Sequence, residues 1–397
     1  MSDGHQEDSF FGFIALLPAA VLVYFVLYGP QPLFPRLATG LALTELQTGL
    51  LTTAAMLPLC LAPLSFGRLL SAVAPHRVLR GSLILLALAT AGFALVDHFP
   101  LLLLIRFLQG LLLPLILTSV MTLTARSADP ETVQRRLAVY VTATILGGFF
   151  GRLTSGVFAG WGDWRHYFYL LAILLAGAAC LPFGGGTGRT SDKDRLHWRN
   201  AARVLADPVC RRVFLCVACV FFIFSAMMNF LPFRMEELRG GTSGFMISLM
   251  YTGYLPGALV SAFSAAIAGR IGGPGRTMGL SMVVFTGTTA LALTGYPVFL
   301  FAVLCLFCAA MFLLHTMATT IINTRGGGQG RPGNALYLTF YYLGGVTGTF
   351  LPGLVYERFG WHAFIATLLT VGGIGLLSLR RIGGYLRAEK IPAGIRE

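Results

Sequence analysis

Three residues with ionisable side chains fall within long apolar segments of this chain of 397 residues: Arg106, Arg152 and His315. A charge is costly to keep in an apolar segment, so such a group is expected to serve a function. Arginine binds anionic or strongly hydrogen-bonding ligands through its fork of N–H donors. Histidine, with an ordinary pKa near 6.5, can carry a proton near neutral pH. We therefore expect charge recognition and proton transfer, with no enzymatic activity and no cofactor.

Each of the three residues also has a structural interpretation. An arginine can satisfy backbone carbonyls and hold a bend, and His315 can be a neutral hydrogen-bonding residue. All acidic residues lie in loops, in tails or at the ends of apolar segments, so the proton carrier would be His315 or an acid at the cavity edge such as Asp97. The lack of a buried carboxylate argues against a dedicated carrier of multivalent organic cations.

The elements that position these groups are predicted to be membrane-spanning helices. The chain is 56% hydrophobic and 11% charged, with a mean hydropathy of +0.75, whereas a soluble domain has about 25% charged residues. About 20 apolar residues span a bilayer as a helix. We predict an all-α polytopic membrane protein with twelve transmembrane helices in two pseudo-symmetric six-helix bundles. The expected spans are 11–30, 46–66, 78–96, 99–124, 135–160, 164–183, 211–233, 244–268, 277–295, 297–322, 334–356 and 361–380.

The net charge of +13 comes from basic residues gathered in alternate loops. Under the positive-inside rule this bias predicts cytoplasmic N- and C-termini and a bacterial-type inner membrane, rather than a nucleic-acid partner. Two Cys-x-x-Cys pairs, beginning at Cys216 and Cys305, have the spacing of metal ligands. Because cysteine is also common in buried apolar helices, no metal site is expected.

An internal repeat divides the chain into two related halves. Gly147, Gly148, Gly151 and Gly156 recur 197 positions further along as Gly344, Gly345, Gly348 and Gly353, and one position breaks the match, since Arg152 aligns with Thr349. Repeated halves are typical of transporters that bind solute between them. Glycines spaced four apart let helices approach closely. We expect an N-terminal bundle over 1–183, a cytoplasmic linker with a short amphipathic helix over 184–210, and a C-terminal bundle with a cytoplasmic tail over 211–397.

Three motifs resemble those of the major facilitator superfamily. The stretch from Gly67 and Arg68 to Arg77 resembles the signature between spans two and three, with Ser71 where the family has aspartate. The run from Arg106 to Gly110, with Gln109, resembles the Arg-x-x-Gln-Gly motif of span four. The run from Gly147 to Gly156 is similar to the antiporter motif of span five, with Arg152 in place of proline.

This resemblance covers the whole chain and implies alternating access, as in the bacterial drug or metabolite:proton antiporters with twelve helices. It implies that spans 1, 4, 7 and 10 line a cavity and that spans 2, 5, 8 and 11 form the moving interface. Proton coupling and recognition of substrate charge are assigned to Arg106, Gln109, Arg152 and His315. The residues assigned to gating and to the interface are Gly67, Arg68, Arg77, Gly110, Gly147, Gly151, Gly156, Gly344, Gly348 and Gly353.

Aromatic and amide side chains near the cavity are expected to contact the substrate. Tyrosine and methionine together form an adaptable, weakly selective wall. The candidates in and near spans one, seven and eleven are Tyr24, Tyr28, Gln31, Met228, Asn229, Tyr337 and Tyr341.

The sequence predicts a secondary active transporter that moves a small organic solute by proton-coupled export of drugs or metabolites. An importer or facilitator of a small organic anion is the alternative, favoured by Arg106 and Arg152. A sensor built on a transporter fold is the second alternative. The expected partners are a small-molecule substrate, protons and membrane lipid, with no nucleic acid, and the expected state is a monomer.

Overall fold

The computed structural model describes residues 3–65, 73–125, 130–160, 162–183, 198–239, 244–325 and 330–380, and every regular element within these ranges is a helix. The candidates Gly67 and Arg68 lie outside the described residues. Proline is the first residue of several helices, including α5, α10, α14 and α15, whose bounds are given below. The N–H groups of the first helical turn have no acceptor within the helix, so proline, which lacks an N–H group, loses no hydrogen bond there.

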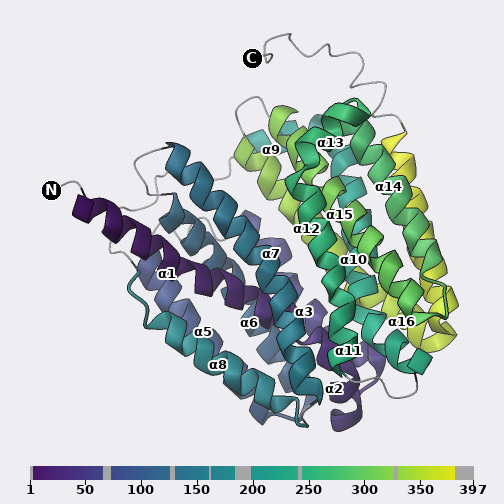
Figure 1. Cartoon of the computed structure of the whole chain (residues 1–397), viewed down its shortest axis with the longest axis horizontal. Coiled ribbons are helices and arrows are strands. Elements are labelled where there is room, and N and C mark those ends of the chain that lie inside the picture. Colours follow the sequence, from purple (N-terminus) through teal and green to yellow (C-terminus); the bar gives the residue numbers. More distant parts are fainter. Residues whose placement is uncertain are drawn as a thin grey trace.

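The helices form two groups that lie side by side (Figure 1). The N-terminal group consists of α1 (Asp3–Tyr28), η1 (Gln31–Leu33), α2 (Phe34–Leu41), α3 (Glu45–Ser65), α5 (Pro75–Leu95), α6 (Phe99–Thr124), α7 (Pro130–Gly160) and α8 (Arg165–Ala179). The C-terminal group consists of α9 (Trp198–Ala206), α10 (Pro208–Arg239), α11 (Gly244–Leu249), η3 (Met250–Gly253), α12 (Tyr254–Ala262), α13 (Ser264–Ile271), α14 (Pro274–Leu291), α15 (Pro297–Arg325) and α16 (Gly330–Leu379).

The prediction of an all-α polytopic membrane protein is confirmed. Nine helices in the described ranges are long and apolar enough to cross a membrane, and α8 is a shorter apolar helix. The 50-residue α16 contains Gly360, whose φ of 73° is not helical, so it joins two helices across a kink. The exact number of twelve spans stays a prediction.

The repeat found in the sequence is also a repeat of packing. A Cβ atom added to Gly147 would lie 2.8 Å from the carbonyl oxygen of Val21, and one added to Gly344 would lie 2.1 Å from that of Ala218. Val21 and Ala218 are themselves 197 positions apart. The absence of a side chain therefore lets α7 pack on α1 in the same way that α16 packs on α10.

A second pair of glycines repeats this arrangement one turn later. A Cβ added to Gly151 would lie 2.8 Å from Cα of Phe25, and one added to Gly348 would lie 2.2 Å from the carbonyl oxygen of Phe222. These four glycines pack helices within each group. The contacts of Gly156 and Gly353 reach the opposite group, at Ser248 of α11 and Leu46 of α3 respectively.

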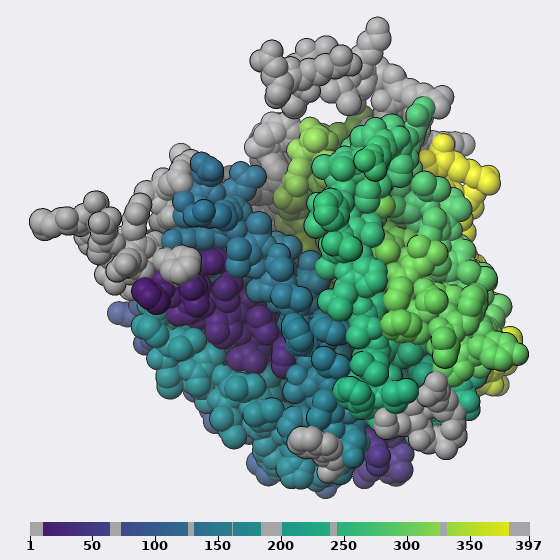
Figure 2. Space-filling view, viewed as in Figure 1, coloured from purple at the N-terminus to yellow at the C-terminus, as the bar shows by residue number. Residues whose placement is uncertain are grey.

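The two groups are in contact at the end of the molecule where α2 and α11 lie. Phe34 of α2 stacks on Phe233 of α10, with ring centroids 6.5 Å apart, and α7 crosses α11 near Gly156. Towards the opposite end, α1 and α7 lean away from α12 (Figure 1). In Figure 2 the two groups, purple to teal and green to yellow, meet along a line across the visible face.

Candidate functional site

Arg152 lies on α7 at the boundary between the two groups, and its side chain is 1% exposed. Its Nε atom donates a hydrogen bond to Oε1 of Gln31 at 2.8 Å, and Nη1 donates to the carbonyl oxygen of Gly148 at 2.7 Å. Both acceptors are neutral. None of the ion pairs that the structure defines within the described ranges involves Arg152.

Three tyrosine rings surround the Arg152 guanidinium group. Its Cζ atom lies 4.6 Å from the ring centroid of Tyr28, 5.0 Å from that of Tyr251 and 4.7 Å from that of Tyr254. Tyr28 belongs to the N-terminal group, whereas the other two belong to the C-terminal group. Cations are attracted to aromatic faces at such distances, and more strongly where water is excluded. The guanidinium group is therefore held by rings from both groups.

A chain of polar side chains continues from Arg152 across the boundary. Gln31 donates from Nε2 to Oδ1 of Asn229 on α10 at 3.4 Å, and Asn229 donates from Nδ2 to the carbonyl oxygen of Gly49 on α3 at 3.4 Å. Gln31 and Asn229 are both buried. Buried amides that satisfy one another fix the relative position of the elements that carry them. The chain therefore links α7, η1, α10 and α3.

Arg106 on α6 is fully buried, but its environment differs from that of Arg152. Its Nη1 atom donates to the carbonyl oxygen of Val26 at 2.8 Å, and Nη2 donates to that of Leu27 at 3.1 Å. The Nε atom donates to the carbonyl oxygen of Leu51 on α3 at 3.0 Å. All of these partners belong to the N-terminal group. The fork of Arg106 therefore joins α6 to α1 and α3.

The local sequence explains why α1 needs this arginine. Helix α1 ends before Gly29-Pro30, and Pro30 has no N–H group to donate to Val26 four residues earlier. The carbonyl groups of Val26 and Leu27 are instead bonded by Arg106. The Phe25 carbonyl accepts from the Gly29 N–H group at 3.0 Å and also from the Tyr167 hydroxyl at 2.9 Å. A cation at the C-terminal end of a helix is also favoured by the helix dipole.

The other residues of the span-four motif extend this contact. Arg106 Nη1 donates to Oε1 of Gln109 at 2.8 Å, and Gln109 donates to Thr90 of α5 at 3.1 Å. A Cβ added to Gly110 would lie 2.3 Å from the carbonyl oxygen of Ala55, so α3 and α6 are in direct backbone contact there. The role of Arg106 and Gln109 in proton coupling stays a prediction.

His315 on α15 is partly exposed and contacts two tyrosines of α16. Its Nδ1 atom lies 2.7 Å from the Tyr337 hydroxyl, and its ring centroid lies 5.2 Å from that of Tyr341. Tyr341 in turn stacks on Phe221 of α10, with centroids 3.6 Å apart. The imidazole is thus placed by aromatic packing and by one hydrogen bond, and it has no acidic partner among the described interactions.

Tyrosines of α1, α7, η3, α12 and α16 meet at the boundary between the groups, and we call them the tyrosine cluster. Tyr24 faces Tyr342 across the boundary, close enough for their hydroxyl groups to interact, and Tyr28 lies near Tyr341 across the same boundary. The rings of these four residues are partly exposed. The members of the cluster are Tyr24, Tyr28, Tyr140, Tyr251, Tyr254, Tyr337, Tyr341 and Tyr342.

The sequence interpretation placed part of this cluster and missed the rest. Tyr24, Tyr28, Tyr337 and Tyr341 were expected near the cavity, and Gln31, Met228 and Asn229 lie beside the cluster at its Arg152 end. Met228 is buried, and its carbonyl oxygen accepts a hydrogen bond from the Tyr251 hydroxyl at 2.8 Å.

Tyr140, Tyr251 and Tyr254 were not among the candidates, and Tyr342 directly follows the candidate Tyr341 in the sequence. Tyr251 and Tyr254 are three residues apart, a spacing that puts both on one face of a helix. That signal was available in the sequence, but span eight was assigned to the moving interface alone.

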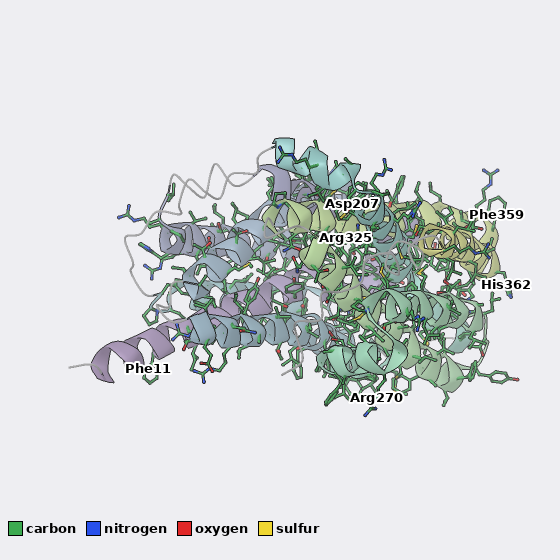
Figure 3. The ribbon with its side chains drawn as sticks, turned by 90° about the horizontal axis from the view of Figure 1, so that it is seen from above. Phe11, Asp207, Arg270, Arg325, Phe359 and His362 are labelled. Atoms are coloured by element: carbon green, nitrogen blue, oxygen red, sulfur yellow. The ribbon has the colours of Figure 1, made fainter. Side chains whose placement is uncertain are left out.

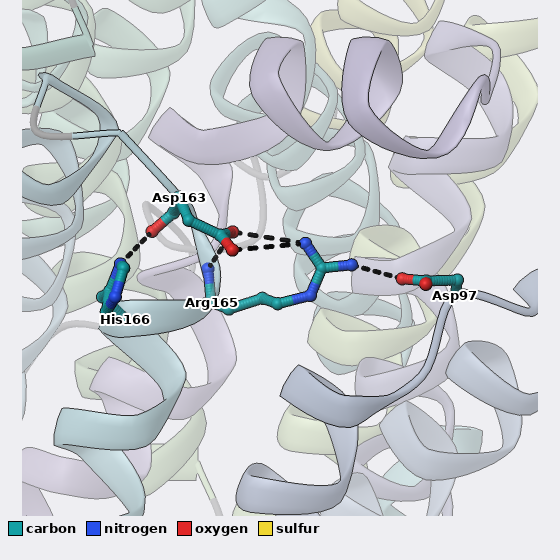
Figure 4. A network of polar contacts seen from close by, with 4 residues as sticks. All are labelled: Asp97, Asp163, Arg165 and His166. Carbon is teal, nitrogen blue, oxygen red and sulfur yellow. Dashed lines mark hydrogen bonds and ion pairs between the residues drawn. The ribbon is translucent and has the colours of Figure 1, made fainter.

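Two further candidates lie away from the cluster. The Asp97 side chain is 70% exposed and pairs with Arg165 at the start of α8, and Asp163 pairs with the same guanidinium group at 3.3 Å (Figure 4). Arg77 is exposed in the first turn of α5. Within the described ranges no group of three His, Cys, Asp or Glu residues is arranged to hold a metal ion.

Comparisons with known proteins agree with this architecture. The family model of the Major Facilitator Superfamily matches residues 16–330. The "Inner membrane transport protein YnfM" of Escherichia coli (strain K12) is 26% identical over 373 residues, which cover 90% of this chain and 88% of that protein. The "Uncharacterized MFS-type transporter YybF" of Bacillus subtilis (strain 168) is 19% identical over 384 residues, which cover 95% of this chain and 94% of that protein.

Solved structures share the fold at low sequence identity. The crystal structure of the nucleoside transporter NupG has a TM-score of 0.76 and 12% identity, and covers 95% of this chain and 100% of that chain. A bacterial homolog of the human lysosomal transporter Spinster, in an inward-facing and unoccupied conformation, has a TM-score of 0.71 and 15% identity over 97% of this chain and 99% of that chain. At these identities the likeness concerns the fold.

Proposed function

Because this chain belongs to the major facilitator superfamily, whose members are membrane transporters and not enzymes, we propose that it exports a small organic solute in exchange for protons. It would act by alternating access at a bacterial inner membrane, as a monomer with both termini in the cytoplasm. The solute would be a drug or a metabolite, bound between the two groups of helices.

The observation that carries this proposal is the tyrosine cluster, because its members come from both groups. A solute bound there would contact both halves at once, so its binding can be linked to their relative movement. Tyrosine rings provide large apolar faces with a polar tip, which suits varied organic solutes. The partly exposed rings of Tyr24, Tyr28 and Tyr341 are the surfaces that a solute would meet first.

Proton exchange would use His315, the residue at this cluster whose ordinary pKa is closest to neutral. It contacts Tyr337 and Tyr341, so a change in its charge would be felt by the rings that bind solute. The antiporter-like motif of α7 supports the outward direction. Its glycines Gly147 and Gly151 pack α7 on α1, and Gly156 meets α11 of the other half.

Reconstitution into lipid vesicles tests the proposal directly. Purified protein is placed in vesicles that contain a pH-sensitive dye, and cationic, neutral and anionic solutes are added in turn against an imposed pH gradient. We expect proton movement that depends on one class of solute. Solute flux without any accompanying proton movement would exclude exchange while leaving transport intact, and vesicles without protein provide the control.

Import or facilitated movement of a small organic anion is the second candidate, and Arg152 favours it. The guanidinium group lies between the halves with neutral hydrogen-bond acceptors. The same vesicles distinguish this candidate, since inward anion flux would be driven by the anion gradient and would not need a pH gradient. Flux of any solute would exclude a sensor without transport activity.

A further inference from the structure

We propose that Arg152 binds the carboxylate group of a solute with an aromatic ring in place of Gln31, and that this exchange of partners opens the polar chain that joins the two halves. This inference rests on the transport function proposed above and names the class of solute. It also assigns to one residue both recognition of the solute and control of the contact between the halves.

The first argument is the charge of Arg152. A buried cation is favoured by an anionic partner with matching geometry, and the planar fork of arginine fits a carboxylate through two parallel hydrogen bonds. Arg152 is 1% exposed and is bonded to the neutral oxygens of Gln31 and Gly148. A carboxylate would therefore make stronger hydrogen bonds with Arg152 than its present partners do.

Comparison with Arg106 shows why the site is assigned to Arg152. The partners of Arg106 include backbone carbonyl groups of α1 and α3, which cannot leave without unfolding the end of α1. Gln31, in contrast, holds Arg152 through a side-chain amide that can rotate about its own torsions. Arg106 also bonds to one side-chain amide, that of Gln109, but its other three hydrogen bonds go to backbone carbonyl groups. Arg152 has one backbone partner and lies at the boundary between the groups, so a ligand could replace Gln31 there while the helices stay folded.

The second argument concerns the body of the solute. The Tyr28 ring is partly exposed and lies 4.6 Å from Arg152 Cζ, so it borders both the accessible part of the cluster and the cation. Tyr28 lies near Tyr254 and Tyr341 of the opposite half. Aromatic rings pair in offset or edge-to-face geometry with one another. A solute with a flat ring beside its carboxylate would match this surface.

The third argument is the connection from Gln31 to the opposite half. The Gln31 amide accepts from Arg152 at Oε1 and donates to Asn229 at Nε2, so one side chain carries both bonds. A carboxylate on Arg152 would leave Gln31 Oε1 without its donor, and rotation of the amide to find another would break the bond to Asn229. Binding of the solute would thereby weaken the contact between the halves.

The test uses three probes with the same ring and different charge: benzoate, benzamide and benzylamine. The midpoint of thermal unfolding of the full chain in detergent is measured as each probe is titrated. We expect benzoate to raise the midpoint, and benzamide and benzylamine to have little effect. Equal effects of benzoate and benzamide, or no effect of benzoate at millimolar concentration, would overturn the proposal.

Variants then locate the site. Arg152→Gln should abolish the effect of benzoate, and Arg152→Lys, which keeps the charge but loses the fork, should weaken binding by roughly tenfold or more. Gln31→Ala should bind benzoate more tightly than the unmodified chain, because the competing amide is gone. The control is Arg270→Gln, which removes one exposed positive charge on α13 (Figure 3).

The Gln31→Ala variant separates a ligand site from a merely structural arginine. If Arg152 only held the helices together, Gln31→Ala would lower the midpoint and leave the benzoate affinity unchanged or weakened, and the proposal would be rejected. Vesicle flux distinguishes this result from failure of the proposed function. Flux of other solutes without benzoate binding would overturn the inference alone, whereas benzoate binding without flux of any solute would overturn the transport function alone.

Discussion

The hydroxyl groups of Thr53 and Thr349 lie 2.8 Å apart, although they belong to opposite halves of the molecule. Thr349 occupies the position that the internal repeat aligns with Arg152. Thr349 and Arg152 each donate to the carbonyl group four residues earlier. Thr349 donates to Gly345 at 3.1 Å, and Arg152 donates to Gly148 at 2.7 Å. The two copies of one position therefore both contact the opposite half, one through a hydroxyl group and the other through a guanidinium group.

Replacement of either threonine by valine should weaken the contact between the halves. Valine has nearly the same shape as threonine but lacks the hydroxyl group, and one such hydrogen bond contributes about 0.5–1.5 kcal/mol. We expect Thr53→Val and Thr349→Val each to lower the midpoint of thermal unfolding slightly. The double variant should be no less stable than the worse single variant, because both changes remove the same bond. Strictly additive losses would show that the two hydroxyl groups are not coupled.

Arg106 should matter more for stability than Arg152. In Arg106→Gln the carbonyl groups of Val26 and Leu27 at the end of α1 lose their donor, and each unsatisfied buried acceptor costs about 1–3 kcal/mol. The Leu51 carbonyl loses its bond to Arg106 as well, but it lies within helix α3. We expect poor yield of folded protein and a large fall in the unfolding midpoint.

Two variants calibrate that result. Tyr167→Phe removes one hydrogen bond from the same end of α1 and should cost only about 0.5–1.5 kcal/mol. Arg152→Gln should be clearly more stable than Arg106→Gln. Arg152 bonds to one backbone carbonyl, that of Gly148, and its other hydrogen bond goes to the Gln31 side chain. Equal losses at the two arginines would contradict the division of roles.

The repeated glycines should tolerate no side chain where helices are in backbone contact. Gly151→Ala and Gly348→Ala would place a Cβ atom 2.8 Å and 2.2 Å from backbone atoms of α1 and α10, respectively. Overpacking of this kind costs about 1–3 kcal/mol, so both variants should unfold at lower temperature. Gly279→Ala is the matched control, since nothing lies within 4 Å of its added Cβ and alanine favours helix. Loss of stability in Gly279→Ala alone would contradict this interpretation.

The sequence contained most of the information about packing within each half. The glycine repeat predicts closely packed helices in both halves, and the partners Val21 and Ala218 lie at the same spacing as the glycines. Hydropathy predicted the helices themselves, because long apolar runs have no other stable form in lipid. The kink at Gly360 explains why two expected spans appear as one helix.

The partners of the charged residues were harder to predict. Arg106 bonds to the end of α1 because helices α1, α3 and α6 pack against one another. The spacing of residues along the chain does not show which helices pack together. The same holds for the three rings around Arg152, which come from α1, η3 and α12. Residue type predicted that these arginines need partners, but only the fold determines which partners they have.

Stability should depend on pH through Asp207, which caps α10 and pairs with Arg325 of α15 (Figure 3). Burial raises the pKa of this carboxyl group, but the bond from the Val209 N–H group at 2.7 Å and the ion pair with Arg325 at 3.0 Å outweigh it, so the pKa lies below its ordinary value. A lowered pKa in the folded state means that the stabilisation is complete above the ordinary value and is lost as pH falls through the folded value.

The unfolding midpoint should therefore fall in acid more steeply in the unmodified chain than in Asp207→Asn. Asparagine can still cap the helix but carries no charge, so this variant should be less stable at neutral pH. The difference between the two proteins should shrink as the pH falls below about 4. Glu357→Gln, at an exposed position on α16, serves as the control and should follow the unmodified chain at every pH. A constant difference across the whole pH range would show that the charge of Asp207 is not responsible.

His315 provides the sharpest test of proton exchange. Glutamine in its place can still accept a hydrogen bond from Tyr337 but cannot carry a proton in this pH range. In vesicles we expect His315→Gln to lose solute-dependent proton movement while downhill solute flux continues. Tyr337→Phe keeps the ring beside His315 and removes only the hydroxyl group 2.7 Å from Nδ1, so it should retain proton movement. If His315→Gln exchanged protons as the unmodified chain does, the carrier would be another group, and Asp97 would be the next residue to replace.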